Sequence, residues 1–259
     1  MSVKYFIKND HLLAGITMKN PLFKENNNMA LHICQSTEDI IQNREILSSL
    51  LQCDLKQFVC AEQTHSTNFH KVTVGDAGRG AYSAQQAIPN TDALYTYESD
   101  ILLTSFTADC VPVIFYGEED HIVGVVHSGW QGTVKEITLK LLLHLKEKEK
   151  CNVANFKVII GPALSQQRFE VDSDVYEKFA ALGYAEEFMY VNEETKKYHI
   201  DNQLTVKKQC ELAGVPTNNI QIDSSCTFES EDCFSYRQNK EDGRHLTFIM
   251  QKANKVFEK

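Results

Sequence analysis

Short apolar segments typical of β-strands alternate along this chain with longer amphipathic segments typical of helices. We expect strands at 72–74, 93–97, 101–106, 111–116, 122–126 and 156–160, and helices at 38–53, 133–150, 174–182 and 205–213. In the second helix, Val134, Ile137, Leu141 and Leu145 recur at three- and four-residue spacing opposite a Lys/Glu face. This alternation predicts an α/β protein.

The chain contains no repeat, linker or low-complexity tract that would mark a domain boundary. Its 259 residues are enough to bury a substantial core, so we expect one domain over residues 1–259. Segments 79–92 and 223–243 are rich in turn formers and polar residues. We expect them to be surface loops, where functional groups often lie.

The charge balance limits the class of partner. The formal net charge is −9, whereas binding to nucleic acid requires clustered Lys and Arg, so we expect no nucleic-acid partner. A small anion remains possible, because two or three placed cations bind it. The first residues lack the apolar core of a signal peptide, and no apolar run reaches the ~18 residues of a membrane span. We therefore expect a cytoplasmic protein without a membrane partner.

The first motif with chemical content lies between Leu102 and Tyr116. Two apolar runs are interrupted there by the polar sequence Thr107-Ala-Asp-Cys110. A carboxylate placed between buried strands needs partners or a ligand, because a buried unpaired charge is costly.

The second motif is Ile122-Val-Gly-Val-Val-His-Ser-Gly-Trp-Gln-Gly-Thr133. A predicted strand ends at His127, and Gly129 and Gly132 flank the only tryptophan before a helix begins. A glycine-rich turn between a strand and a helix N-terminus is a usual place for a ligand.

His65, in Ala61-Glu-Gln-Thr-His-Ser-Thr67, is a third candidate beside Cys110 and His127. Each alone also fits a core histidine or a packed cysteine, and spacings of 45 and 17 residues match no zinc-finger pattern. Together, two imidazoles and a thiolate suit Zn²⁺, and three protein ligands leave one tetrahedral position open, as in catalytic sites. The eight cysteines contain no CxxC pair, which favours free thiols.

Short motifs over nearly the whole chain carry a family resemblance. In order, they are Asn28-Met-Ala-Leu-His32, Asn43-Arg44, Gln63-Thr-His65, Gly78-Arg-Gly80, Thr91-Asp-Ala-Leu94, Thr107-Ala-Asp-Cys-Val-Pro-Val113, His127-Ser-Gly-Trp-Gln-Gly-Thr133, Ile160-Gly-Pro162, Phe169-Glu-Val171, Phe234-Ser-Tyr-Arg237 and Asp242-Gly-Arg244. They resemble the YfiH/YlmD-like proteins, long described as laccase-domain proteins or multicopper polyphenol oxidases and now regarded as purine nucleoside phosphorylases with adenosine deaminase activity.

The resemblance implies a single-domain mixed α/β (α+β) fold with stacked mixed sheets flanked by helices. It places the metal ligands on His65, Cys110 and His127, with zinc as the expected ion and copper as an alternative. It also implies phosphorolysis of adenosine, inosine or methylthioadenosine to free base and ribose 1-phosphate, so the expected partners are a purine nucleoside and phosphate. The chain departs from the family at Gln131, usually Arg or Lys, at Met18-Lys19-Asn20, usually Arg-Gly-Gly, and at Leu164-Ser165, often Cys-Cys.

The two reactions need different groups. Deamination needs a nucleophilic water at purine C6, which zinc provides near pH 7. Asp109 is placed either to serve catalysis, by orienting a histidine or moving a proton, or to cap the neighbouring turn. Phosphorolysis needs cations beside ribose C1′, for which the candidates are Arg44, Arg237 and Arg244, each equally compatible with an ordinary salt bridge. We expect His32 to contact the substrate or to be a core histidine.

Three rival classes remain. A polyphenol oxidase with several copper ions needs many histidines in His-x-His pairs, whereas this chain has nine histidines and no such pair. A cysteine hydrolase would use Cys110 as nucleophile and His127 as base. A non-enzymatic interaction protein with a structural zinc would close the site with a fourth protein ligand.

Overall fold

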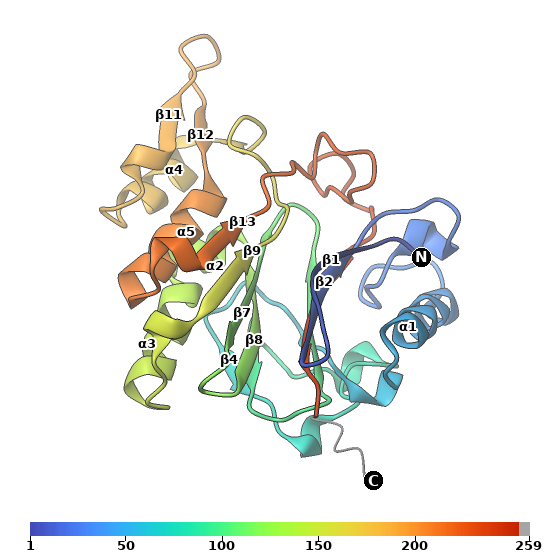
Figure 1. The fold of residues 1–259 in the computed structure, drawn as a ribbon. Helices are drawn as coiled ribbons and strands as arrows, with labels where there is room; N and C mark the ends of the chain where they lie inside the picture. Colours follow the sequence, from blue (N-terminus) through green and yellow to red (C-terminus); the bar gives the residue numbers. More distant parts are fainter. Residues whose placement is uncertain (254–259) are drawn as a thin grey trace, which may run out of the picture.

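The computed structural model describes residues 1–253, which form a layered mixed α/β fold (Figure 1). The strands are β1 (Val3–Lys8), β2 (Leu12–Thr17), β3 (Phe58–Val59), β4 (Phe69–Lys71), β5 (Ala93–Thr96), β6 (Leu102–Thr107), β7 (Val111–Gly117), β8 (Ile122–Ser128), β9 (Lys157–Ile160), β10 (Glu170–Val171), β11 (Met189–Val191), β12 (Tyr198–Ile200), β13 (Ile220–Ile222) and β14 (His245–Gln251). The helices are α1 (Thr37–Leu51), α2 (Trp130–Val134), α3 (Ile137–Glu147), α4 (Ser173–Ala180) and α5 (Asn202–Ala213). The predicted mixed α/β class is confirmed.

Two large sheets pack face to face at the centre of the molecule. One has the strand order β1-β2-β14-β6-β3 and the other β13-β9-β7-β8-β5-β4. Most neighbouring strands are antiparallel, but β3 with β6, β4 with β5 and β13 with β9 are parallel. Apolar side chains from the inner faces form the core between the sheets, among them Leu103, Ile114, Val125, Ile159 and Ile249.

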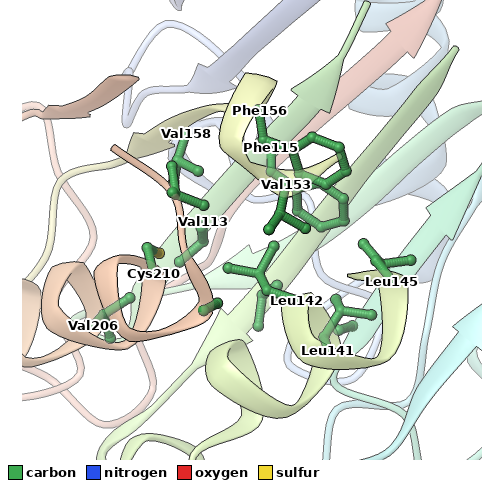
Figure 2. Packing of buried hydrophobic residues seen from close by; sticks show 14 of the residues in the cluster. Val113, Phe115, Leu141, Leu142, Leu145, Val153, Phe156, Val158, Val206 and Cys210 are labelled. Carbon is green, nitrogen blue, oxygen red and sulfur yellow. The ribbon is translucent and has the colours of Figure 1, made fainter. Parts of the chain in front are cut away.

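Helices cover the outer faces of both sheets. Figure 2 shows Leu141, Leu142 and Leu145 of α3 packed near Val113 and Phe115 of β7. Each large apolar side chain buried in this way contributes about 1.5–3 kcal/mol. On the other side of the molecule, α1 covers the five-stranded sheet (Figure 1). The small sheet β10-β12-β11 lies with α4 at one end of the molecule.

Two sequence expectations differ from the structure, and several strands were not predicted from the sequence. The helix expected over 133–150 is divided into α2 and α3, because Glu136 adopts a left-handed backbone with φ 63° and accepts a hydrogen bond from Tyr184. The strand expected at 72–74 is wrong: β4 ends at Lys71, and Thr73 and Asp76 form a capping box around a short 3₁₀ turn. The sequence patterns did not reveal β1, β2, β3, β10, β11, β12, β13 or β14.

Within residues 1–253, no helix combines the length and the apolar character needed to cross a membrane. All eight cysteines are free thiols, as predicted.

Candidate metal centre and its cavity

Three donors that are distant in the sequence meet where β7 begins and β8 ends, two neighbouring strands inside the six-stranded sheet. Pro112 of β7 pairs with His127 of β8, so Cys110, just before β7, lies beside the His127 ring. His65 comes from the connection between β3 and β4. Sγ of Cys110 lies 3.8 Å from Nε2 of His65, and one donor atom from each residue lies within 4.8 Å of the others. The structure therefore brings the three predicted ligands together, and residues 1–253 contain no second such group.

The backbone at this centre is unusual. His65 and Asp109 adopt left-handed conformations, with φ of 58° and 85°, each of which costs on the order of 1–3 kcal/mol for a residue other than glycine. Gly129 has an ordinary φ of −65°, but a Cβ there would lie 2.5 Å from Cδ2 of His65 and 2.9 Å from Sγ of Cys110. Gly129 is thus required by the space that the donors occupy.

Asp92, whose side chain is fully buried, connects two of the donors. Its Oδ1 lies 2.8 Å from Nδ1 of His127 and accepts a 3.1 Å hydrogen bond from the amide of His65. Its Oδ2 accepts 2.7 Å bonds from the amide and the hydroxyl of Ser66. Burial alone raises the pKa of Asp92, but the bonds from His127 and Ser66 lower it to about 2, so the carboxylate is ionised and Nδ1 of His127 is the donor.

Sequence reasoning gave no role to Asp92. The available signal was its position directly before the wholly buried strand β5, where a carboxylate must find partners.

Cys110 and His127 shift each other's pKa. Burial alone raises the pKa of Cys110, but the imidazoles of His127 and His65 lower it to about 6. Burial alone lowers the pKa of His127, but Cys110 and Asp92 raise it to about 9. These directions favour a thiolate in the metal-free protein, which is the form of cysteine that binds a metal or attacks as a nucleophile.

A cavity of about 700 Å³ opens onto the three donors. Its lining has an apolar part, which includes Trp130, Leu164 and Phe169, and a cationic part formed by Arg237 and Arg244. This size and mixed character are typical of small-molecule sites.

His32, Asp109 and Arg237, which were predicted from the sequence, all line this cavity. Both carboxylate oxygens of Asp109 are engaged: Oδ1 accepts from the hydroxyl of Thr227 at 2.7 Å and Oδ2 from the amide of Arg237 at 2.6 Å. Asp109 therefore attaches the loop that carries Arg237 to the metal centre. His32 is partly open to solvent, but desolvation and the positive charges of Arg244 and Arg44 lower its pKa to about 4, so His32 is neutral at pH 7.

The prediction for Arg44 needs correction. Its side chain is buried at 1 % exposure and does not line the cavity. Its guanidinium donates to the main-chain carbonyls of Met29, Gly80 and Ala81, over 2.7 to 2.9 Å. These hydrogen bonds join α1 to two loops and leave the guanidinium unavailable for a ligand in the cavity. Arg244, a further candidate from the sequence, does line the cavity.

All three departures noted in the sequence lie in or near this region. Gln131 and Leu164 are part of the cavity lining. Nζ of Lys19 lies 3.0 Å from Oδ2 of Asp242, and thereby supports the turn that leads to Arg244.

Comparison with known proteins identifies the family of this chain. Residues 15–252 match the family model described as multi-copper polyphenol oxidoreductase laccase. The chain is 32% identical over 251 residues to the purine nucleoside phosphorylase YlmD of Bacillus subtilis, covering 94% of this chain and 90% of that protein. It is 36% identical over 226 residues to a purine nucleoside phosphorylase of Staphylococcus saprophyticus, covering 86% and 84%.

Solved structures give the same result. The crystal structure of Bacillus licheniformis hypothetical protein YfiH matches with a TM-score of 0.91 at 31% identity, over 97% of each chain. The crystal structure of YlmD from Geobacillus stearothermophilus matches with a TM-score of 0.88 at 30% identity, over 94% of this chain and 93% of that one. The resemblance seen in the sequence is confirmed, and the chain belongs to the YfiH/YlmD-like family of multi-copper polyphenol oxidoreductase laccase proteins.

Proposed function

We propose that this protein is a zinc-dependent purine nucleoside phosphorylase that also deaminates adenosine. The observation that carries the proposal is one cavity that combines the His65, Cys110 and His127 donors with two arginines and an apolar lining. The names of relatives that match over most of the chain support the phosphorylase reaction. The substrates would be phosphate and adenosine, inosine or methylthioadenosine.

The donor set fits a metal ion. Two imidazoles and a thiolate suit Zn²⁺, and Cu²⁺ accepts the same donors. Gly129 leaves the space between His65 and Cys110 open, and Asp92 holds the His127 ring so that Nε2 is the free nitrogen. When bound, zinc supplies a Lewis acid that makes water nucleophilic near neutral pH.

Different residues of the cavity would bind the phosphate, the sugar and the purine. In phosphorolysis, a phosphate oxygen attacks C1′, the C1′–N9 bond breaks, and the base leaves with a proton on nitrogen. Arg237 and Arg244 supply the charge that holds phosphate. Nη1 of Arg237 donates to the carbonyl of Arg168 at 2.9 Å, which fixes the guanidinium at the cavity rim. Phe169 and Trp130 supply apolar surface for the purine. His32, uncharged at pH 7, offers a hydrogen bond to the sugar or base.

The deciding experiment measures free base and ribose 1-phosphate from inosine and adenosine, with and without phosphate. We expect base release that requires phosphate, and inosine formation from adenosine without it. His127→Ala should abolish deamination, and Arg244→Gln should raise the KM for phosphate at least tenfold. If the wild-type protein releases no base from either nucleoside, the phosphorylase proposal is wrong.

Cysteine hydrolysis is the second candidate, favoured by the lowered pKa of Cys110 beside the His127 imidazole. One tightly bound zinc per chain that is lost in Cys110→Ser would contradict it. A multicopper oxidase is disfavoured, because the residues described here hold one group of three or more close His, Cys, Asp or Glu donors, whereas such an enzyme binds several copper ions.

A further inference from the structure

We propose that Asp92 is the positioning residue that presets both histidines of the metal centre, and that metal affinity therefore depends on its carboxylate. The inference rests on the proposed metal site. Asp92 itself lies behind the donors and does not line the cavity. It acts on His127 through the ring and on His65 through the backbone.

The first action fixes the His127 ring. An imidazole can bind a metal through either nitrogen, and the hydrogen bond made by the other nitrogen decides which one. Nδ1–H of His127 donates to Oδ1 of Asp92 at 2.8 Å, and the amide of His127 donates to the carbonyl of Asp92 at 2.7 Å. Asp92 therefore holds both the ring and the main chain of His127, with Nε2 left to face Cys110.

The second action fixes the loop that carries His65. The amides of Thr64, His65 and Ser66 all point at the Asp92 carboxylate, over 2.7 to 3.2 Å. Three consecutive amides converge on one anion only when the loop is tightly curled, and His65 accordingly has a φ of 58°. The charge of Asp92 thus offsets the cost of the left-handed conformation that aims the His65 ring at Cys110.

Oδ1 of Asp92 accepts from the His127 ring and from the His65 amide, whereas Oδ2 accepts from the amides of Thr64 and Ser66, which makes the isosteric amide a sharp test. In Asp92→Asn, the new NH₂ group must face either the amides of Thr64 and Ser66 or the Nδ1–H of His127 and the amide of His65. In each orientation hydrogen-bond donors confront each other, so the loop that carries His65 is released in the first case and the His127 ring in the second.

The experiment measures zinc affinity of the purified full chain by competition with a chromophoric chelator. We expect Asp92→Asn to weaken binding by roughly 10- to 100-fold, the effect of losing an outer partner of a metal-bound histidine. Asp76→Asn is the matched control, since Asp76 similarly accepts from the amide of Thr73 at 3.0 Å and lies 3.2 Å from Nε2 of His70, outside the cavity. It should leave zinc affinity within twofold of wild type.

A second measurement needs no variant. In the zinc-loaded wild-type protein, long-range ¹H–¹⁵N spectra should show the His127 proton on Nδ1, protected from exchange with solvent. A proton on Nε2, or an Asp92→Asn protein that folds and binds zinc as tightly as wild type, would overturn the role of Asp92. Neither result tests the proposed function. That proposal fails if the wild-type protein releases no base in the presence of phosphate.

Discussion

Gly129→Ala tests whether the space between the donors belongs to a metal ion. The backbone at this position, with φ −65° and ψ 163°, is open to any residue, so the substitution introduces no conformational strain. Its whole effect is steric, because the new methyl carbon would start 2.5 Å from Cδ2 and 2.9 Å from Nε2 of His65. Carbon atoms pack at about 3.5 Å or more, so the imidazole must move by about 1 Å.

A displacement of this size exceeds the ~0.5 Å tolerance within which a functional constellation works. We expect zinc affinity to fall at least tenfold and turnover by roughly 100-fold. Stability should change little, because His65 is only partly buried and can shift toward the cavity. An overpacking cost of about 1 kcal/mol would lower Tm by about 2–4 °C in a chain of this size.

The assay combines chelator competition for zinc, phosphorolysis rate and thermal unfolding. Gly132→Ala, three residues further along and inside α2, is the control, because its Cβ would come no closer than 3.3 Å to Ile137 and touches none of the donor side chains. It should leave all three measurements near wild type. If Gly129→Ala keeps wild-type zinc affinity at an unchanged Tm, the metal does not lie between His65 and Cys110.

Two further predictions concern stability. Arg44→Met should lower the free energy of unfolding in urea by several kcal/mol, because each buried carbonyl left unpaired costs about 1–3 kcal/mol; the KM for phosphate should not change, and a raised KM at full stability would restore Arg44 as a ligand. His245 is fully buried, and burial lowers its pKa from 6.5 to about 4. As the pH falls, His245 is therefore protonated in the unfolded chain before it is protonated in the folded protein. The folded state loses stability between pH 6.5 and pH 4, and the free energy of unfolding is lower by about 2 kcal/mol at pH 5. In His245→Gln, denaturant midpoints should fall less between pH 7 and pH 5, and an unchanged pH dependence would contradict this origin.

The parts of the fold that were predictable are those whose pattern is local. β5 to β9 are short apolar runs bounded by polar turns, and α3 shows its buried face in the spacing of Leu141 and Leu145. β2 and β14 were not recognised, although both are as continuously buried as β6 and β8. Their identity depends on pairing with each other across more than 200 residues.

The candidate site also has a part that could be predicted from the sequence and a part that could not. Donor chemistry selected His65, Cys110 and His127, because the residue types alone carry that information. The roles of Arg44 and Asp92 depend on which main-chain groups come near them, and those groups belong to other segments. A buried arginine and a ligand-binding arginine look alike in a sequence, and only the carbonyls around Arg44 distinguish them.

The position of β14 has a consequence for synthesis on the ribosome. β14 lies between β2 and β6, so the five-stranded sheet is split until residues 245–251 have been made. β6 leads directly into the Asp109–Cys110 turn, and its edge stays unpaired during this time. A nascent chain that stops before His245 should expose two unpaired strand edges and require chaperone protection. Completion of the metal centre is therefore expected to follow the insertion of β14 between β2 and β6.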